Sequence, residues 1–224
     1  PSKFQMSFLK PARHDKITNF LKPKVKRLKV YNTSPEKIRY ITLPRNNKVL
    51  AESILDMLPV LANKLWDRLP SSERNYRKDL AHKQSGLSLR FGFNIFHKPG
   101  ALTKFPISKQ IITLADMLLG FISHDKDYSA FSINKNRKFQ KHFDVKNTKP
   151  SIIVSFGTHK SGGGLIIYDK NGGATTYDIN RKFLLFDGKC LEHESDSWED
   201  GDRYTLVFYK MNYKAEKTLA SLIA

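Results

Sequence analysis

The sequence has a single cysteine, few acidic side chains and no long apolar run. One thiol, Cys190, among 224 residues cannot form a disulfide within the chain or a zinc site made of several cysteines. Although Cys190 lies near His193, we interpret it as a small buried apolar side chain rather than a metal ligand. The absence of a stretch of about 18 apolar residues predicts that nothing in the chain spans a membrane.

A signal peptide is also missing from the N-terminal residues, which contain neither its apolar segment nor a cleavage site. We therefore expect a protein that is not secreted, nuclear in a eukaryote and cytoplasmic otherwise. Because the sequence begins at Pro1 rather than at Met, we leave open whether another segment precedes it.

The shortage of acids makes the chain strongly basic. There are 39 Lys and Arg against 21 Asp and Glu, a formal net charge of +18 with a pI of about 9.9. Residues 1–50 contain Asp15 and Glu36 as their only acids, and their basic side chains include Lys24, Lys26, Arg27 and Lys29. We predict that these four cations contact the phosphates of a nucleic acid, DNA in the first instance. A basic surface without a partner and a nuclear-import signal are the alternatives.

Three side chains in the second half of the chain can close on one metal ion: His142, Asp144 and His193. If residues 139–144 form a strand, His142 and Asp144 point to the same side of it, while Phe143 points into the opposite layer. A histidine on a neighbouring strand can then complete one face of an octahedron. Two imidazoles and a carboxylate are the ligand set of non-haem Fe(II) oxygenases, in which three coordination positions stay open for a co-substrate and dioxygen.

Arg203 follows His193 and opens the apolar run 204–209. A guanidinium fork is suited to pair with a carboxylate through two parallel hydrogen bonds. We predict that Arg203 holds the far carboxylate of a dicarboxylic acid whose keto-acid end chelates the metal.

The order of these motifs resembles a known family. Residues 132–137 precede His142-Phe143-Asp144, the segments 151–157 and 163–165 follow, and His193 and Arg203-Tyr204 complete the pattern. This sequence pattern resembles that of the Fe(II)/2-oxoglutarate dioxygenases, and more closely that of their TET/JBP branch, which oxidises methyl-bearing bases. The resemblance covers roughly the last hundred residues, a domain-sized stretch.

The resemblance implies a role for each matching residue. Iron ligation falls on His142, Asp144 and His193, and binding of the co-substrate 2-oxoglutarate on Arg203, with dioxygen as the second co-substrate. Arg137 stands where relatives place a second basic group near 2-oxoglutarate. Asn147 stands where relatives place a polar residue that faces the target base. Relatives with an acid at that position read a cytosine amino group, so the amide of Asn147 leaves the identity of the base open.

We expect an α+β fold with two parts. Residues 1–48 are predicted to form a basic N-terminal arm with short strands, and residues 49–224 a single dioxygenase domain. In that domain, about 49–124 provide helical support, about 128–210 the core, and the remainder a basic C-terminal tail. Apolar residues at helical spacing predict one helix up to Leu69, kinked or divided at Pro59, and a second over 108–123 with Ser108 as N-cap.

The core is predicted to be a double-stranded β-helix, the cupin-like jelly roll, because many short strands alternate with glycine-containing turns. Alternating residues also predict a strand over 87–96 ahead of it. Gly162, Gly163 and Gly164 indicate a tight turn or a close approach of the backbone. His159 lies in a turn-like segment, where we expect it to be exposed. The expected core strands are 128–134, 139–144, 151–157, 164–168, 174–178, 182–187 and 203–210.

The leading functional hypothesis is hydroxylation of a methyl group on a nucleic-acid base. Thymine and 5-methylcytosine are the first candidates, and N6-methyladenine demethylation is a further one. Because a base inside a duplex cannot reach the iron, the target nucleotide is expected to flip out, with Phe143 or Tyr209 as stacking partners. A prolyl-type protein hydroxylase, an alkylation-repair enzyme and a catalytically inactive jelly roll that binds nucleic acid are the alternatives.

Overall fold

The computed structural model describes residues 38–69, 86–92, 102, 105–123, 127–169, 171–211 and 219. All of them belong to the larger of two compact units, Glu36–Ala224. The four cations predicted to contact phosphates, Lys24, Lys26, Arg27 and Lys29, lie outside the described residues, as does most of the C-terminal tail.

Two helices, α1 (Arg45–Arg68) and α3 (Pro106–Ile122), pack against each other. The side chains that α1 buries recur every three or four positions, as an amphipathic helix requires: Ala51, Ile54, Leu55, Leu58, Ala62, Leu65 and Trp66. Pro59 lies inside α1 and does not divide it. Neither helix is long and apolar enough to cross a membrane.

The start of α3 differs from our prediction. The helix begins at Pro106, and Ser108 is buried inside it instead of capping it. Proline suits the first helical position because its fixed φ is already helical and its missing N–H has no partner to lose there. The pattern of buried residues that we expected for this helix is otherwise present.

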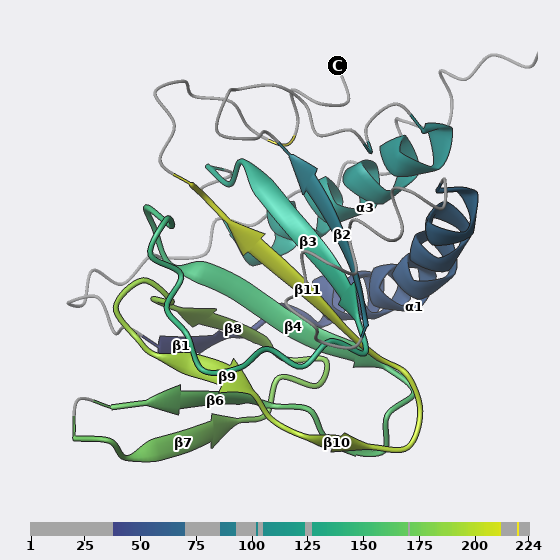
Figure 1. The fold of residues 1–224 in the computed structure, drawn as a ribbon. Coiled ribbons are helices and arrows are strands. Elements are labelled where there is room, and N and C mark those ends of the chain that lie inside the picture. The colour runs from purple at the N-terminus through teal and green to yellow at the C-terminus, as the bar shows by residue number, and fades with distance from the viewer. Residues whose placement is uncertain are drawn as a thin grey trace, which may run out of the picture. The chain divides into compact units, whose positions relative to one another are not determined.

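A six-stranded antiparallel sheet forms the centre of the unit (Figure 1). The strand order is β1 (Ile38–Ile41), β8 (Phe183–Phe186), β4 (Ser151–Gly157), β11 (Arg203–Tyr209), β3 (Ala130–Lys135) and β2 (Leu87–Gly92). A second, three-stranded sheet has the order β7 (Ala174–Tyr177), β6 (Leu165–Tyr168) and β9 (His193–Ser195), and β5 (Ser161–Gly162) pairs with β10 (Trp198–Glu199).

The two faces of the central strand β11 have different surroundings. Tyr204, Leu206 and Phe208 belong to the apolar core shared with α1 and α3. Arg203, Thr205, Val207 and Tyr209 line a cavity on the opposite side. Strict alternation of side chains along a strand produces this division. A smaller apolar cluster on the cavity side joins the large sheet to the three-stranded one through Ile153, Leu165, Ile167, Ile179, Leu184 and Phe186.

Most of the predicted core strands are present within one or two residues of their expected ends, and β4 has the predicted bounds. The strand expected over 139–144 is wrong: this segment is irregular and forms one isolated bridge, between His142 and His193. Phe143 therefore does not turn into an opposite layer, and 46% of its surface is exposed. The reason is that 139–144 is attached to β9 and to the turn after β8 by single backbone bonds rather than by a ladder.

Candidate active site

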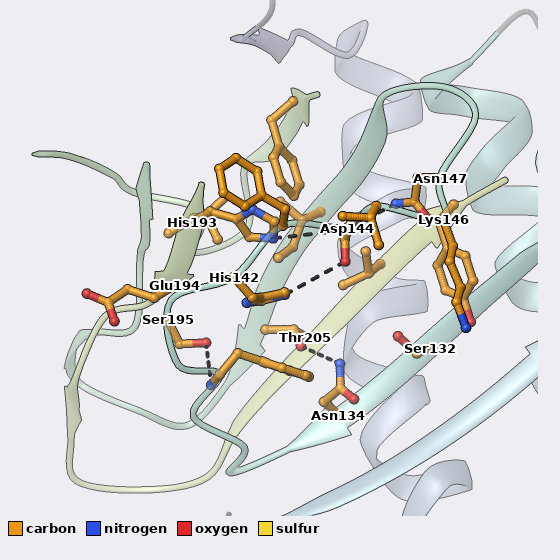
Figure 2. Close-up of a pocket in the computed structure, with 18 of the residues that line it drawn as sticks. Ser132, Asn134, His142, Asp144, Lys146, Asn147, His193, Glu194, Ser195 and Thr205 are labelled. Carbon is orange, nitrogen blue, oxygen red and sulfur yellow. Dashed lines mark hydrogen bonds and ion pairs between the residues drawn. The ribbon is translucent and has the colours of Figure 1, made fainter. Parts of the chain in front are cut away.

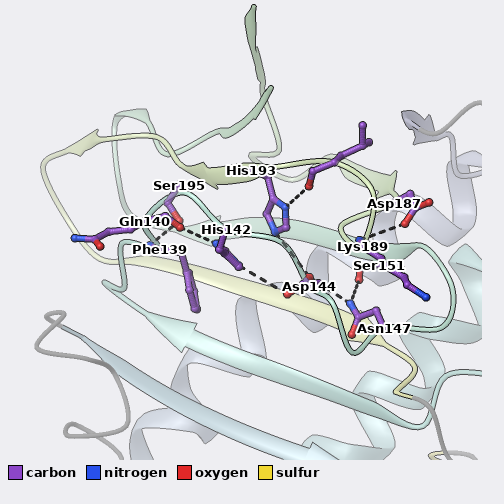
Figure 3. A network of polar contacts seen from close by, with 11 residues as sticks. Phe139, Gln140, His142, Asp144, Asn147, Ser151, Asp187, Lys189, His193 and Ser195 are labelled. Carbon is purple, nitrogen blue, oxygen red and sulfur yellow. Dashed lines mark hydrogen bonds and ion pairs between the residues drawn. The ribbon is translucent and has the colours of Figure 1, made fainter. Parts of the chain in front are cut away.

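His142, Asp144 and His193 converge on one point. One ligand atom from each of them lies within 4.8 Å of the other two. Nε2 of His142 is 3.7 Å from Oδ1 of Asp144, and Nε2 of His193 is 3.8 Å from Oδ2 of Asp144. These separations are too long for hydrogen bonds and leave room for an ion between the three groups. Figure 3 shows the two imidazoles directed toward different oxygens of the carboxylate.

The backbone brings the two histidines together. The N–H of His142 donates to the carbonyl of His193, and the N–H of His193 donates to the carbonyl of His142, each over 3.0 Å. Nδ1 of His142 lies 2.7 Å from the carbonyl oxygen of Gln140, and Nδ1 of His193 lies 2.8 Å from that of Leu191. Because a carbonyl only accepts, Nδ1 carries the proton in each ring, and Nε2 keeps the lone pair that a metal needs.

The third ligand, Asp144, has its own supports. Its N–H donates to the carbonyl of Gly188 over 2.8 Å. The side-chain amide of Asn147 donates to Oδ2 of Asp144 over 3.2 Å and to Oγ of Ser151 over 3.0 Å (Figure 3). Asn147 thus orients the carboxylate, a contact that the sequence did not reveal.

Burial adjusts the charge of His193. The side chain is almost fully buried, and this burial lowers the pKa of the imidazole, with a smaller opposing effect from its hydrogen bond to Leu191 and from Asp144. His193 is therefore neutral near pH 7, which is the form that binds a metal.

Gly188 leaves no room for a side chain beside the three ligands. A Cβ added there would lie 2.8 Å from Oδ2 of Asp144 and 3.2 Å from Cε1 of His193. We expect Gly188→Ala to displace the carboxylate and weaken metal affinity by about 10- to 100-fold, the usual effect of disturbing the groups that orient metal ligands. Calorimetric titration with Co(II) or Mn(II) measures this loss.

Gly172→Ala is the matched control for Gly188→Ala. Gly172 has a φ of 84°, so alanine strains the backbone there, but nothing lies within 4 Å of the added Cβ. Equal metal affinities for the two variants would contradict a role for the space beside Gly188.

Arg203 is the most buried cation of the site, with 2% of its surface exposed. Its Nε donates to the carbonyl of Gly163 over 2.9 Å. Burial lowers the pKa of the guanidinium to about 10, against a weaker opposing effect from Asp196. A buried cation costs free energy unless an anion meets it, so the surroundings of Arg203 are those of an anion-binding group.

Other polar atoms near Arg203 have no hydrogen-bond partner among the residues that the structure describes. They are Oγ of Ser155 and both ring nitrogens of His159. Ser155 stands opposite Thr205 in the register of β4 and β11, on the cavity side. Gly163 lies beside both the ring of His159 and the guanidinium of Arg203. A Cβ added to Gly163 would lie 3.2 Å from Cδ2 of His159 and 2.7 Å from Nε of Arg203.

Buried polar atoms without partners usually mark the place of a ligand or an ordered water. A carboxylate held by Arg203 would be within the same polar surroundings as Ser155 and His159. The donor set therefore fits the distal carboxylate of a dicarboxylic acid, and the close approach predicted for the glycines 162–164 is confirmed at Gly163.

Two further predictions are wrong. His159, expected to be an exposed loop residue, has 6% of its surface exposed. Burial, and then the charge of Arg203, lower the pKa of its imidazole, so it is neutral near pH 7. The ring of His159 packs beside Gly163 and Arg203, which explains the burial. Cys190, expected to be buried, is exposed in the turn after β8.

The metal ligands and Arg203 line one cavity of about 300 Å³, at the lower end of the range for small-molecule sites. Figure 2 shows polar side chains of the large sheet and of β9 across this cavity from each other. Sequence reasoning missed the hydrogen-bonded set on its wall: Oγ of Ser88 donates to Asn134 over 2.7 Å, and Nδ2 of Asn134 donates to Thr205 over 3.1 Å. The alternation of β11 could have placed Thr205 beside Arg203.

Arg137 and Asn147, the two predicted site residues with implied contacts to ligands, are both buried. Asn147 lines the cavity. Arg137 stacks over the ring of Phe139, with its Cζ 4.6 Å from the ring centroid, and Phe139 lines the cavity.

No protein-family model and no curated protein matches the sequence. Solved structures do match. The structure of NgTET1 in complex with 5mC DNA is similar with a TM-score of 0.51 and 15% identity, over 83% of this chain and 78% of that chain. The chain has the NgTET1 fold. At this identity the likeness concerns the fold alone.

Two bacterial structures are more distantly similar. One is an oxidoreductase of the 2OG-Fe(II) oxygenase family from Burkholderia pseudomallei, with a TM-score of 0.46, 16% identity, and coverage of 70% of this chain and 80% of that chain. The other is a prolyl-4-hydroxylase from Pseudomonas putida, with a TM-score of 0.40, 12% identity, and coverage of 78% and 91%.

Proposed function

We propose that the protein is an Fe(II)- and 2-oxoglutarate-dependent dioxygenase with a double-stranded β-helix core, of the TET/JBP branch. The observation that carries this proposal is the presence of two histidines, a carboxylate and a buried, anion-seeking Arg203 on one cavity. Two imidazoles and one carboxylate leave open positions on Fe(II), and the arginine can hold a carboxylate of the co-substrate.

Each side chain has a part in this chemistry. His142, Asp144 and His193 would hold the iron through Nε2, a carboxylate oxygen and Nε2. Arg203 would hold the distal carboxylate of 2-oxoglutarate, with Ser155 and His159 as neighbouring donors. Iron, 2-oxoglutarate and dioxygen, when bound, supply the oxidising power for C–H hydroxylation, with succinate and carbon dioxide as co-products.

Part of the cavity wall is apolar. Leu165, Phe186 and Val207 line it, and Phe186 packs edge-on against His193 with their ring centroids 4.9 Å apart. Apolar surroundings strengthen the pairing of Arg203 with a carboxylate.

For the substrate, we propose a methyl group on a base of a flipped-out nucleotide. The basic composition supports a nucleic-acid partner. Beside the metal ligands, Phe143 and Val145 expose apolar surface and Lys146 adds a cation, all three on the lining of the cavity. An exposed aromatic next to a cation suits a base and its phosphate, so Phe143 is the proposed stacking partner. The NgTET1 likeness, to a complex with 5mC DNA, is in keeping with this substrate.

Asn147 favours a base that presents a hydrogen-bond donor. Both hydrogens of its amide are used, one toward Asp144 and one toward Ser151. What Asn147 can offer a base is therefore its side-chain oxygen, an acceptor. The amino group of 5-methylcytosine or of N6-methyladenine can donate to it, and so can N3–H of thymine. Asn147 is therefore compatible with all three candidate bases.

The basic residues Lys24, Lys26, Arg27 and Lys29 remain proposed phosphate contacts of the same substrate. They would add affinity that depends on salt and not on sequence.

Succinate release from the purified chain with Fe(II) and 2-oxoglutarate tests the proposal. The substrates are oligonucleotides that differ only in one base: thymine, cytosine, 5-methylcytosine, adenine or N6-methyladenine. We expect succinate to form in step with one methylated base, which gains oxygen or loses its methyl group in mass spectra of the digested strand. Asp144→Ala is the matched inactive control. Succinate without a changed base would contradict the substrate, and absence of both metal binding and succinate would contradict the enzyme.

A further inference from the structure

Two further arginines lie at the cavity, apart from Arg203: Arg90 lines it, and Arg137 is buried against the ring of the lining residue Phe139. Only 6% of the surface of Arg137 is exposed, and its Nε has no hydrogen-bond partner among the residues that the structure describes. Arg90, on β2, is exposed and lines the cavity. The two guanidinium groups are close enough that Arg90 lowers the pKa of Arg137, in addition to the larger effect of burial.

This pair is unusual because like charges repel and because burial penalises the charge of Arg137. A buried guanidinium group is stabilised when an anion binds beside it. A pair of guanidinium groups with an unused buried donor is suited to an oxyanion that brings its own negative charge.

The position of the pair points to the substrate side of the cavity. The Cζ atom of Arg137 lies 4.6 Å from the ring centroid of Phe139, and the ring of Phe139 lies 5.9 Å from that of the metal ligand His142. Arg90 stands opposite Ser132 in the register of β2 and β3, and both line the cavity wall. An oxyanion at Arg90 would thus lie on the same cavity as the reacting centre.

Two oxyanions are available, a carboxylate of 2-oxoglutarate and a phosphate of the substrate strand. In the proposed function, one carboxylate of 2-oxoglutarate lies at the metal and the other at Arg203, so both are already bound. We propose that Arg90 and Arg137 bind a backbone phosphate beside the target base, Arg90 through direct hydrogen bonds and Arg137 by adding positive charge behind it. This inference rests on the proposed function and moves Arg137 from the co-substrate to the substrate.

The test measures binding rather than turnover. A fluorescent oligonucleotide with one 5-methylcytosine is titrated at several salt concentrations against wild type, Arg90→Gln and Arg137→Met, each loaded with Co(II) and 2-oxoglutarate. We expect about tenfold weaker binding for each variant and a salt slope that is smaller by about one. Affinity for 2-oxoglutarate, measured by calorimetry without the oligonucleotide, should be unchanged.

Single methylphosphonate substitutions on either side of the target base locate the phosphate. The methylphosphonate that replaces the bound phosphate should weaken oligonucleotide binding to wild type by about tenfold. It should leave binding to Arg90→Gln nearly unchanged, because that variant has already lost the contact and the two losses do not add. Arg181→Gln is the control, since Arg181 is an exposed arginine paired with Asp56 on α1. It should bind as wild type does.

Three results would overturn the inference. The first is that the losses of affinity from Arg90→Gln and from the methylphosphonate add at every phosphate position. The second is a weakened affinity for 2-oxoglutarate with unchanged oligonucleotide binding, and the third is an equal loss of oligonucleotide affinity in Arg181→Gln. The second result would return Arg137 to the co-substrate. If the phosphate coupling appears while no base is oxidised, the phosphate site stands and the proposed reaction is wrong. Because Arg90 is exposed, its variant remains informative even if Arg137→Met fails to fold.

Discussion

Asp144→Ala is expected to remove metal binding and to lower turnover by about 1000-fold or more. The carboxylate is the one anionic member of the three converging side chains, and its two oxygens face Nε2 of His142 and Nε2 of His193. Without it, two imidazoles remain, which cannot fix a divalent ion in one geometry. Titration with Co(II) measures metal binding, and succinate release measures turnover.

The control for this variant is Asp56→Ala, which removes an exposed carboxylate of α1 that pairs with Arg181. It should leave both metal binding and turnover unchanged. Oligonucleotide affinity should also remain nearly intact in Asp144→Ala, because the phosphate contacts do not pass through the metal. A variant that still binds one Co(II) with wild-type affinity would show that the metal site is elsewhere.

Arg203→Lys is the second large effect, and it should raise the concentration of 2-oxoglutarate needed for half-maximal turnover by about 100-fold. Lysine keeps the charge but replaces the planar fork by a single ammonium, which cannot form two parallel hydrogen bonds with a carboxylate. It also loses the bond from Nε to the carbonyl of Gly163. Disturbing a buried hydrogen-bonded charge pair costs about 2–5 kcal/mol, which supports this magnitude.

Calorimetric titration with 2-oxoglutarate in the presence of Co(II) gives the affinity directly. Arg181→Lys, the same exchange at an exposed arginine, is the matched control. Metal affinity should be equal in wild type and Arg203→Lys, because Arg203 contacts none of the three ligands. An unchanged requirement for 2-oxoglutarate in Arg203→Lys would exclude Arg203 from its binding site.

The parts of the fold with a regular apolar pattern could be predicted from the sequence. The spacing of Leu58, Leu65 and their neighbours in α1 leaves one apolar stripe, which records burial against one face. The nearly continuous apolar run of β11 is typical of a strand that is covered on both faces. The convergence of His142, Asp144 and His193, with Arg203 on the same cavity, could be predicted for a different reason, since the chemistry of a metal site restricts its members to few residue types.

The segment that carries two of the ligands could not be predicted in its conformation. Residues 139–144 have alternating character, but their backbone bonds go to His193 and Gly188, which are distant in sequence. The burial of His159 was missed because Gly163, Arg203 and the end of β4 enclose it together. Such enclosure is a property of tertiary contacts, and a short window of sequence contains no trace of it.

The two-sided character of β11 has a consequence for how this chain can change. Point substitutions at Thr205 or Val207 alter the cavity and leave the helix-side core of Leu206 and Phe208 in place, so selectivity can drift while the fold persists. Insertion or deletion of one residue within the strand exchanges the two sets at once, because side chains alternate with a period of two. Length variation should therefore be absent from 203–209 in any functioning descendant, whereas the cavity-side positions Thr205 and Val207 can diversify one at a time.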